Sequence, residues 1–438
     1  MTTKITNLLD GPMPTPLASL ATCSPLSTSL AAPRTEVALG GRIPVLDGLR
    51  GIAILLVMVF HVWMFGIVSD YTGIGAQYTL GERLYSHVAA VGWVGVDLFF
   101  VLSGFLITGI LYDSRNDPHY YRVFYARRTV RIFPLYYAFL VLFCGIVPYA
   151  LGLLHHPEFV PSHDSTITKL SVWSYTLNWY VGLKGFSIIS ASLRHFWSLS
   201  VEEQFYLAWP FLVLTLPRRR LMGLCSGLVV FAFVLRVILL RLQLPHAAFV
   251  WTFSRIDCLA IGAMVALAAR NAQDWKTIAR WASRLTLPAL CALAPLLALE
   301  DFRPRFMSEQ FLLSSLKFSL VGIFFGGCLA MAVRARQESL MNRFLSSPFL
   351  RFFGKYSYCL YICHNPFIVV FAKVGLRSDN LTEILGNKFL AIVALNAIVF
   401  AAAIVIALAS WNLFEKHWLK LKDLPFLQHV FRTEFVGS

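Results

Sequence analysis

The chain has 438 residues, of which 57% are hydrophobic and only 14% are charged, and its formal net charge is +15. Soluble domains carry about 25% charged residues, so this composition excludes a soluble enzyme and predicts an all-α, polytopic membrane protein. A net charge of this sign also suits nucleic-acid binding. However, the basic residues segregate by expected membrane side, as described below, and we predict no nucleic-acid partner.

The first 40 residues are rich in Ser, Thr, Pro and Ala, and they contain no apolar run of signal-peptide length. This composition predicts a disordered, uncleaved tail over residues 1–40. We expect a membrane domain over residues 41–415. A short basic tail over residues 416–438 then lies in the cytoplasm.

The first apolar stretch, residues 43–68, is long enough to cross a bilayer and carries Arg50 near its start and His61 inside it. A helix rises about 1.5 Å and turns about 100° per residue, so His61 lies roughly 16 Å deeper than Arg50 on nearly the same face. Ionisable residues at that depth are costly and indicate a working site. The structural alternative is a buried histidine bonded to a neighbouring helix.

A polar loop is predicted over residues 69–90, followed by a second span at residues 91–112. Asp97 lies inside this span and needs a partner there. Ser103 belongs to a set of small residues that permit close helix approach.

Residues 120–137, YYRVFYARRTVRIFPLYY, form a basic segment. A helix would gather Arg127, Arg128 and Arg131, because they are spaced three and four residues apart. Guanidinium groups match phosphate oxygens, so the cluster suits a phosphate site. An ordinary positively charged membrane anchor is the alternative.

The stretch HFWSLSVEEQFYLAWP, residues 195–210, begins the fourth predicted span and carries Glu202 and Glu203 side by side. Adjacent helical residues point about 100° apart, so at most one of these carboxylates faces a given partner. Tyr206 and Trp209 extend the Glu202 face and favour an inward-facing cluster. The alternative is acidic charge that stabilises a helix N-terminus.

A later span carries His364, with Pro366 two residues on, where a proline should kink the helix. His364 is either a ligand residue or a structural one beside the kink.

In all, ten spans are predicted, at residues 43–68, 91–112, 132–153, 195–217, 221–241, 250–269, 285–300, 311–333, 355–376 and 387–411.

The distribution of Lys and Arg predicts the orientation of these spans. With a cytoplasmic N-terminus, the segments on the cytoplasmic side hold 24 basic residues and the opposite loops hold 7. We therefore expect both termini in the cytoplasm. No Cys, His and acidic residues share metal-ligand spacing, so no metal site is expected.

Five motifs stand out along the chain, namely LDGLRGIAILLVMVFH (46–61), GVDLFFVLSGFLI (95–107), RRTVRIFPLYY (127–137), WSLSVEEQFYLAWP (197–210) and SYCLYICHNP (357–366). In sequence and in order they resemble the acyltransferase-3 family of integral membrane O-acyltransferases. The resemblance extends from residue 43 to about residue 415 and is loose over residues 211–340.

The resemblance implies transfer of an acyl group, commonly acetyl, from acyl-CoA to a hydroxyl, usually of a surface carbohydrate or a glycolipid, in the bacterial inner membrane. Arg50 and His61 match the family's functionally critical pair, and Arg128 and Arg131 match its Arg-x-x-Arg motif. Some members carry an appended esterase-like domain. This sequence ends about 20 residues after its last predicted span, which favours a standalone enzyme.

Together these readings assign roles to the candidate residues. Neutral imidazole can serve as a general base, so His61 is the predicted base, oriented by Asp97, Glu202 or Glu203. Acyl-CoA would dock at the basic residues. The candidate donor-binding residues are Arg50, Arg127, Arg128 and Arg131, and the candidate acceptor-binding residues are Ser103, Tyr206, Trp209 and His364.

The alternative to an enzyme is a secondary transporter that uses these charged residues as a proton relay. The sequence contains no second copy of the Arg–His helix, which disfavours that class.

Overall fold

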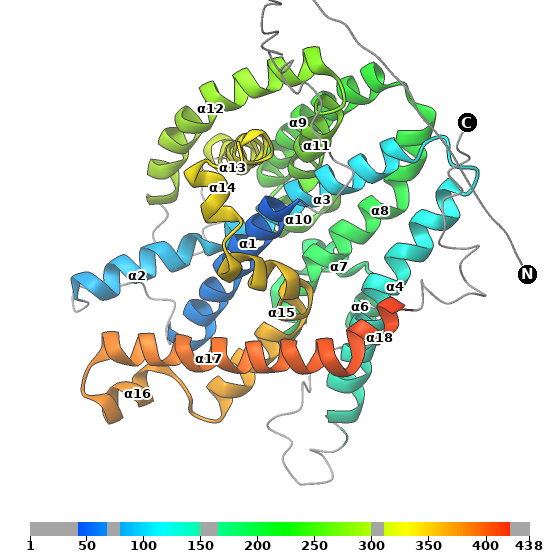
Figure 1. Cartoon of the computed structure of the whole chain (residues 1–438). Helices are drawn as coiled ribbons and strands as arrows, with labels where there is room; N and C mark the ends of the chain where they lie inside the picture. Colours follow the sequence, from blue (N-terminus) through cyan, green and yellow to red (C-terminus); the bar gives the residue numbers. More distant parts are fainter. Residues whose placement is uncertain (1–42, 68–78, 148, 150–164, 299–310, 421–438) are drawn as a thin grey trace, which may run out of the picture. The chain divides into compact units, whose positions relative to one another are not determined.

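A computed structural model describes residues 43–67, 79–147, 149, 165–298 and 311–420, and over these residues the chain is helical (Figure 1). The predictions for residues 1–40 and for most of the C-terminal tail concern residues outside these ranges. The expected all-α membrane fold is confirmed. Within the described residues, seven helices are long and apolar enough to cross a bilayer, or eight if the pair α15 and α16, bent by 56°, counts as one span.

The first half of the described chain contains the helices that carry most of the motifs. In order these are α1 (Pro44–Val62) with the π-helical turn η1 (Trp63–Ile67), α2 (Leu80–Ala90), the 3-10 turn η2 (Val91–Trp93), α3 (Val94–Asp113), α4 (Tyr120–Val141) with η3 (Leu142–Ile146), α6 (Thr166–Trp173), α7 (Leu177–Lys184), η5 (Phe186–Ile188), η6 (Ala191–Phe196) and α8 (Trp197–Thr215).

The second half contains a further set of long and short helices. In order these are α9 (Arg218–Arg241), α10 (Pro245–Val250), α11 (Thr252–Ala268), α12 (Ala272–Ala298), α13 (Phe311–Arg334), α14 (Leu340–Leu345), α15 (Pro348–Lys373), α16 (Ser378–Leu385), α17 (Lys388–Ser410), η7 (Trp411–Glu415) and α18 (Lys416–Leu419).

Two expected boundaries were wrong. The second half of the predicted polar loop is helix α2, because Thr79 and Glu82 form a capping box that satisfies the first backbone N–H groups. The helix that carries the third predicted span, α4, begins at Tyr120 rather than at residue 132, so the basic segment is itself the start of a long helix.

Three predicted spans fall outside the set of described helices that are long and apolar enough to cross a bilayer by themselves. One is α15, which qualifies only together with α16, and the others are α8 and α12. Helix α8 carries Glu202, Glu203 and Gln204 within its 19 residues, and the first half of α12 carries Asp274, Lys276, Arg280 and Arg284. These polar side chains lower the mean hydropathy of both helices. The total of ten spans therefore stays a prediction.

Close helix contacts hold the candidate residues in place. Helix α1 packs along α15, and α3 packs along α11, as Figure 1 shows. A Cβ added at Gly354 would overlap the carbonyl oxygen of Asp47, and one added at Gly104 would overlap that of Leu259. Glycine at these positions lets two backbones approach directly. The α1–α15 contact brings the two conspicuous histidines of the sequence onto neighbouring helices.

Candidate active site

A polar cavity of about 110 Å³ lies among α1, α3, α4, α8 and α15, and it contains charged residues of both signs. Three arginines and two glutamates contribute to its wall, together with hydroxyl and aromatic side chains. Its lining residues are Arg50, Val96, Phe99, Phe100, Ser103, Arg128, Arg131, Ile132, Tyr175, Ser198, Leu199, Glu202, Glu203, Tyr206, Ser357, Tyr358 and Tyr361.

The basic side of the cavity joins two motifs that lie far apart in the sequence. Arg50 comes from α1, where it lies 3.6 Å from Asp47, and Arg128 and Arg131 come from α4. The Arg128 guanidinium lies over the ring of Tyr206 at 5.7 Å. Such contacts hold a guanidinium in place while leaving its N–H groups available to an anion.

Arg127 does not belong to this basic group. It is exposed and does not line the cavity, although it is the immediate neighbour of Arg128. Consecutive residues of a helix point about 100° apart, so α4 turns one of the two towards the cavity and the other away. The prediction that a helix gathers all three guanidinium groups was therefore wrong for Arg127.

The acidic side of the cavity is a hydrogen-bonded group on α3 and α8. The hydroxyl of Ser103 donates to Glu202 at 2.7 Å, and the hydroxyl of Tyr206 lies 3.0 Å from Ser103 Oγ and 3.4 Å from Glu202 Oε2. Glu203 also lines the cavity. The structure thus brings together four of the residues predicted from the sequence, and it orders one carboxylate by two hydroxyl groups.

Three histidine rings cluster beyond the cavity. His364 Nε2 lies 3.3 Å from His61 Nδ1, and the ring centroid of His195 lies 5.0 Å from that of His364 and 6.2 Å from that of His61. Asn365 donates to the carbonyl oxygen of Ala191 at 2.6 Å and lies 3.4 Å from His195 Nδ1. His364 and Asn365 are completely buried. The expected intramembrane histidine therefore belongs to a group of three.

Tyr361 and Ser198 connect the cavity to the histidines. Both line the cavity and contact each other through their hydroxyl groups, and Tyr361 also donates to the carbonyl oxygen of His195 at 3.1 Å. The Tyr361 ring centroid lies 5.8 Å from that of His364. The wall of the cavity is therefore also one side of the histidine cluster.

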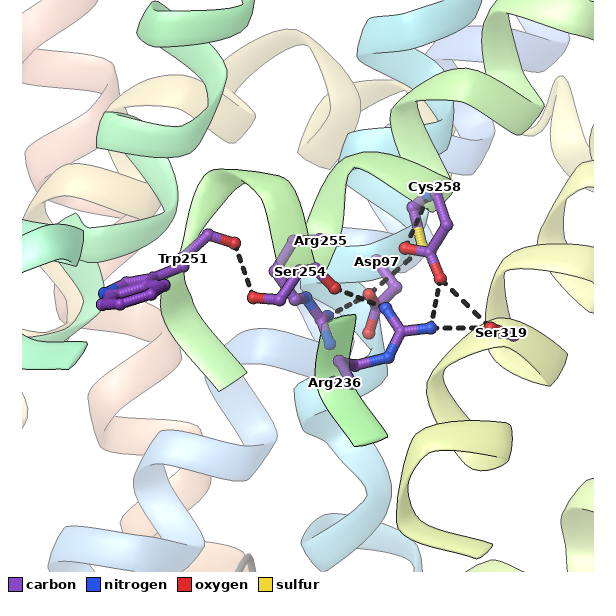
Figure 2. A network of polar contacts seen from close by, with 8 residues as sticks. Asp97, Arg236, Trp251, Ser254, Arg255, Cys258 and Ser319 are labelled. Carbon is purple, nitrogen blue, oxygen red and sulfur yellow. Dashed lines mark hydrogen bonds and ion pairs between the residues drawn. The ribbon is translucent and has the colours of Figure 1, made fainter. Parts of the chain in front are cut away.

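Asp97 takes part in a different network, shown in Figure 2. It forms an ion pair with Arg255 and accepts from the Cys258 thiol at 3.4 Å, and it is completely buried. Arg236 pairs with Asp257 at 2.7 Å in the same network. Asp97 was one of three carboxylates predicted to orient His61, and that alternative does not fit, because the cationic partner of this buried carboxylate is Arg255 of α11.

Two of the predicted acceptor-binding residues, Trp209 and His364, do not line the cavity. Trp209 donates to Thr108 at 2.8 Å and stacks on Phe205, so it packs in the core rather than in the cavity wall. His364 lies against His61 rather than at the cavity surface.

The sequence interpretation missed His195, Asn365, Ser198 and Tyr361. Ser198, Tyr361 and Asn365 lie inside two of the recognised motifs, and His195 is the first residue of HFWSLSVEEQFYLAWP, but no role was predicted for any of them. Polar residues within or beside an intramembrane motif that carries ionisable side chains could have been recognised as candidate site residues. Only the packing of η6 against α15, however, shows that the two stretches meet.

Comparisons with known proteins agree with the resemblance stated from the motifs. A family model described as an acyltransferase domain matches residues 43–412. The chain is 26% identical over 366 residues to "Peptidoglycan O-acetyltransferase OatA" of Listeria monocytogenes, covering 76% of this chain and 50% of that protein. It is 29% identical over 347 residues to "Putative peptidoglycan O-acetyltransferase YrhL" of Bacillus subtilis, covering 76% and 49%.

A third relative is "O-acetyltransferase OatA" of Staphylococcus aureus, 28% identical over 347 residues, with 75% of this chain and 51% of that protein covered. The chain thus spans about half the length of these curated relatives. No solved structure matches.

Proposed function

We propose that this chain, which belongs to the acyltransferase domain family over residues 43–412, moves an acyl group, acetyl in the first instance, from acyl-CoA to a hydroxyl of a carbohydrate or glycolipid. The observation that carries the proposal is the continuity of the site. A cavity with three arginines in its wall ends at Tyr361 and Ser198, directly beside the cluster that contains His61. The printed names of the relatives support a carbohydrate acceptor.

The arginines are suited to the donor. Acyl-CoA carries several phosphate groups, and Arg128 and Arg131 offer guanidinium forks that bind phosphate oxygens. The wall of the cavity is also one side of the histidine cluster, so the reacting end of the donor is the part that we place inside it. The nucleotide would therefore stay outside the cavity, with the thioester inside.

His61 is suited to the chemistry. A hydroxyl is a poor nucleophile at neutral pH, and a neutral imidazole can take its proton as it attacks the thioester carbonyl. The new C–O bond forms, the C–S bond breaks, and the proton held by the imidazole passes to the departing thiolate. The reaction then yields an ester and free CoA, and His61 returns to its neutral form.

We further propose ten spans, cytoplasmic termini and the inner membrane as the location. The excess of Lys and Arg in the segments assigned to the cytoplasm supports this topology. Single cysteines placed in residues 115–131 and 270–284 should resist a membrane-impermeant thiol reagent in intact cells, and cysteines in residues 165–190 should react. Reaction of the 115–131 segment from outside would overturn both the topology and a cytoplasmic donor.

The function is tested with purified protein in lipid nanodiscs, radiolabelled acetyl-CoA and glycan or glycolipid acceptors. We expect label to appear in an alkali-labile ester on the acceptor. In cells, mass spectrometry and NMR of surface glycans should show O-acetyl groups that disappear when the gene is deleted. Identical glycans in both strains, together with no release of CoA by the purified protein, would overturn the proposal.

A further inference from the structure

The hydrogen bonds around His364 determine which of its ring nitrogens carries a proton. His364 Nδ1 lies 2.9 Å from the carbonyl oxygen of Leu360 and 2.8 Å from that of Tyr361. A carbonyl oxygen only accepts hydrogen bonds, so Nδ1 of this buried ring is the protonated nitrogen. Nε2 then has a lone pair, and it is the atom that faces His61.

The same reasoning applies to His61. Its Nδ1 lies 2.8 Å from the carbonyl oxygen of Val57 and 3.3 Å from His364 Nε2. Both neighbours are acceptors, so His61 carries its proton on Nδ1 and shares it between them. His61 Nε2 is therefore the nitrogen with a free lone pair, and it is the one able to accept a proton from a hydroxyl.

We propose that His364 is the positioning residue for His61, in the place that a carboxylate takes in a Ser-His-Asp triad. This inference rests on the proposed function, because it assigns a role in the same reaction. When His61 Nε2 takes the proton of the acceptor hydroxyl, the ring becomes an imidazolium whose Nδ1–H is held by the neutral Nε2 of His364. That hydrogen bond becomes charge-assisted and strengthens as the positive charge develops.

The surroundings of His364 support this role. Among the residues that the structure describes, the hydrogen-bonding neighbours of the His61 ring are Val57 and His364, and no carboxylate is one of them. Glu202, the ordered acid of the cavity, is held by hydroxyl groups instead. His364 is completely buried and bound by two carbonyl groups of its own helix, so its Nε2 has a fixed direction.

Two substitutions test the contacts of the two ring nitrogens of His364 separately. In His364→Gln the amide reaches about as far as Nε2 and can offer its oxygen to His61, whereas in His364→Asn it reaches only about as far as Nδ1. We expect His364→Gln to keep kcat within about tenfold of the wild type. His364→Asn should lose roughly 10- to 100-fold in kcat, which is the loss of one hydrogen bond to a charged group. The KM values for acyl-CoA and for the acceptor should stay unchanged in both variants.

His87→Gln is the matched control. His87 is an exposed histidine on α2 whose Nδ1 lies 2.7 Å from the carbonyl oxygen of Arg83, and its substitution should leave kcat unchanged. A structural role of His364 through its backbone contacts predicts the reverse order, with the Asn variant as active as the Gln variant or more so. That order, full activity of both variants, or a defect confined to the acceptor KM would each overturn the positioning role.

Failure of the underlying function gives a different result. If His61→Gln protein transferred acyl groups at the wild-type rate, His61 would not be the base and the proposed chemistry itself would be wrong. An inactive His61→Gln protein beside fully active His364 variants would leave that chemistry in place and remove only the role of His364.

Discussion

Replacement of Arg128 tests whether the basic side of the cavity binds the donor. Arg128 lines the cavity and lies over the rings of Tyr206 and Phe124 at 5.7 and 5.9 Å. A hydrogen bond between a guanidinium and a phosphate contributes about 1.5–3 kcal/mol, and each 1.4 kcal/mol corresponds to a factor of ten in affinity. Arg128→Ala should therefore weaken acyl-CoA binding by roughly 10- to 150-fold and leave the protein inserted in the membrane.

The neighbouring arginine provides the control. Arg127 is exposed and lies outside the cavity, so Arg127→Ala should change the dissociation constant of acyl-CoA by less than about twofold. Arg131 lines the cavity but is more exposed than Arg128, and its loss should have an effect between the two. Binding is measured by isothermal titration of nanodisc-embedded protein with a non-hydrolysable acyl-CoA analogue. Equal affinities in the Arg128 and Arg127 variants would refute donor docking and leave only a membrane anchor.

Three further substitutions test the other parts of the site. His61→Gln should lower kcat by about 10²–10⁴-fold with acyl-CoA binding retained, as a rate assay beside the same titration will show, and near wild-type turnover would contradict the assignment of the base. Asp97→Ala leaves buried Arg255 without its partner and should cost about 3–5 kcal/mol of stability; an unchanged midpoint of thermal unfolding would mean that the ion pair is not needed. Gly104→Val places a side chain against the carbonyl oxygen of Leu259 and should cost at least about 1–3 kcal/mol, and normal yield of folded protein would argue against the close α3–α11 contact.

Most of the membrane architecture could be predicted from the sequence, because the bilayer imposes one simple rule on the chain. A backbone in hydrocarbon must satisfy its own hydrogen bonds, so apolar runs of sufficient length read directly as helices. The rule leaves α8 and α12 undecided. Polar residues interrupt the expected span in α8, and charged residues precede the expected span in α12. It failed at α2, where a capping box extends the helix into an expected loop. At α2 a local hydrogen-bonding pattern extends the helix, whereas at α8 and α12 local polar residues lower the mean hydropathy.

The chemical types at the candidate site were also readable from single helices. Arg50 and His61 share a face of α1 because eleven residues make about three full turns, and Glu202 and Tyr206 share a face of α8 because they are four residues apart. These predictions depend only on the periodicity of a single helix. The contact between Ser103 and Glu202 was not predicted.

What the sequence alone determined is therefore the membrane class, the helical periodicity and the residue types on each face. The tertiary structure decided which faces meet. Asp97 forms an ion pair with Arg255 rather than a contact with His61. The ring nitrogen that faces His61 belongs to His364, which lies 303 residues away along the chain. Helix periodicity limits where a side chain can point, but the identity of its neighbour depends on how α1, α3, α11 and α15 pack. That packing is set by glycine contacts between helices whose order in sequence does not reveal their adjacency.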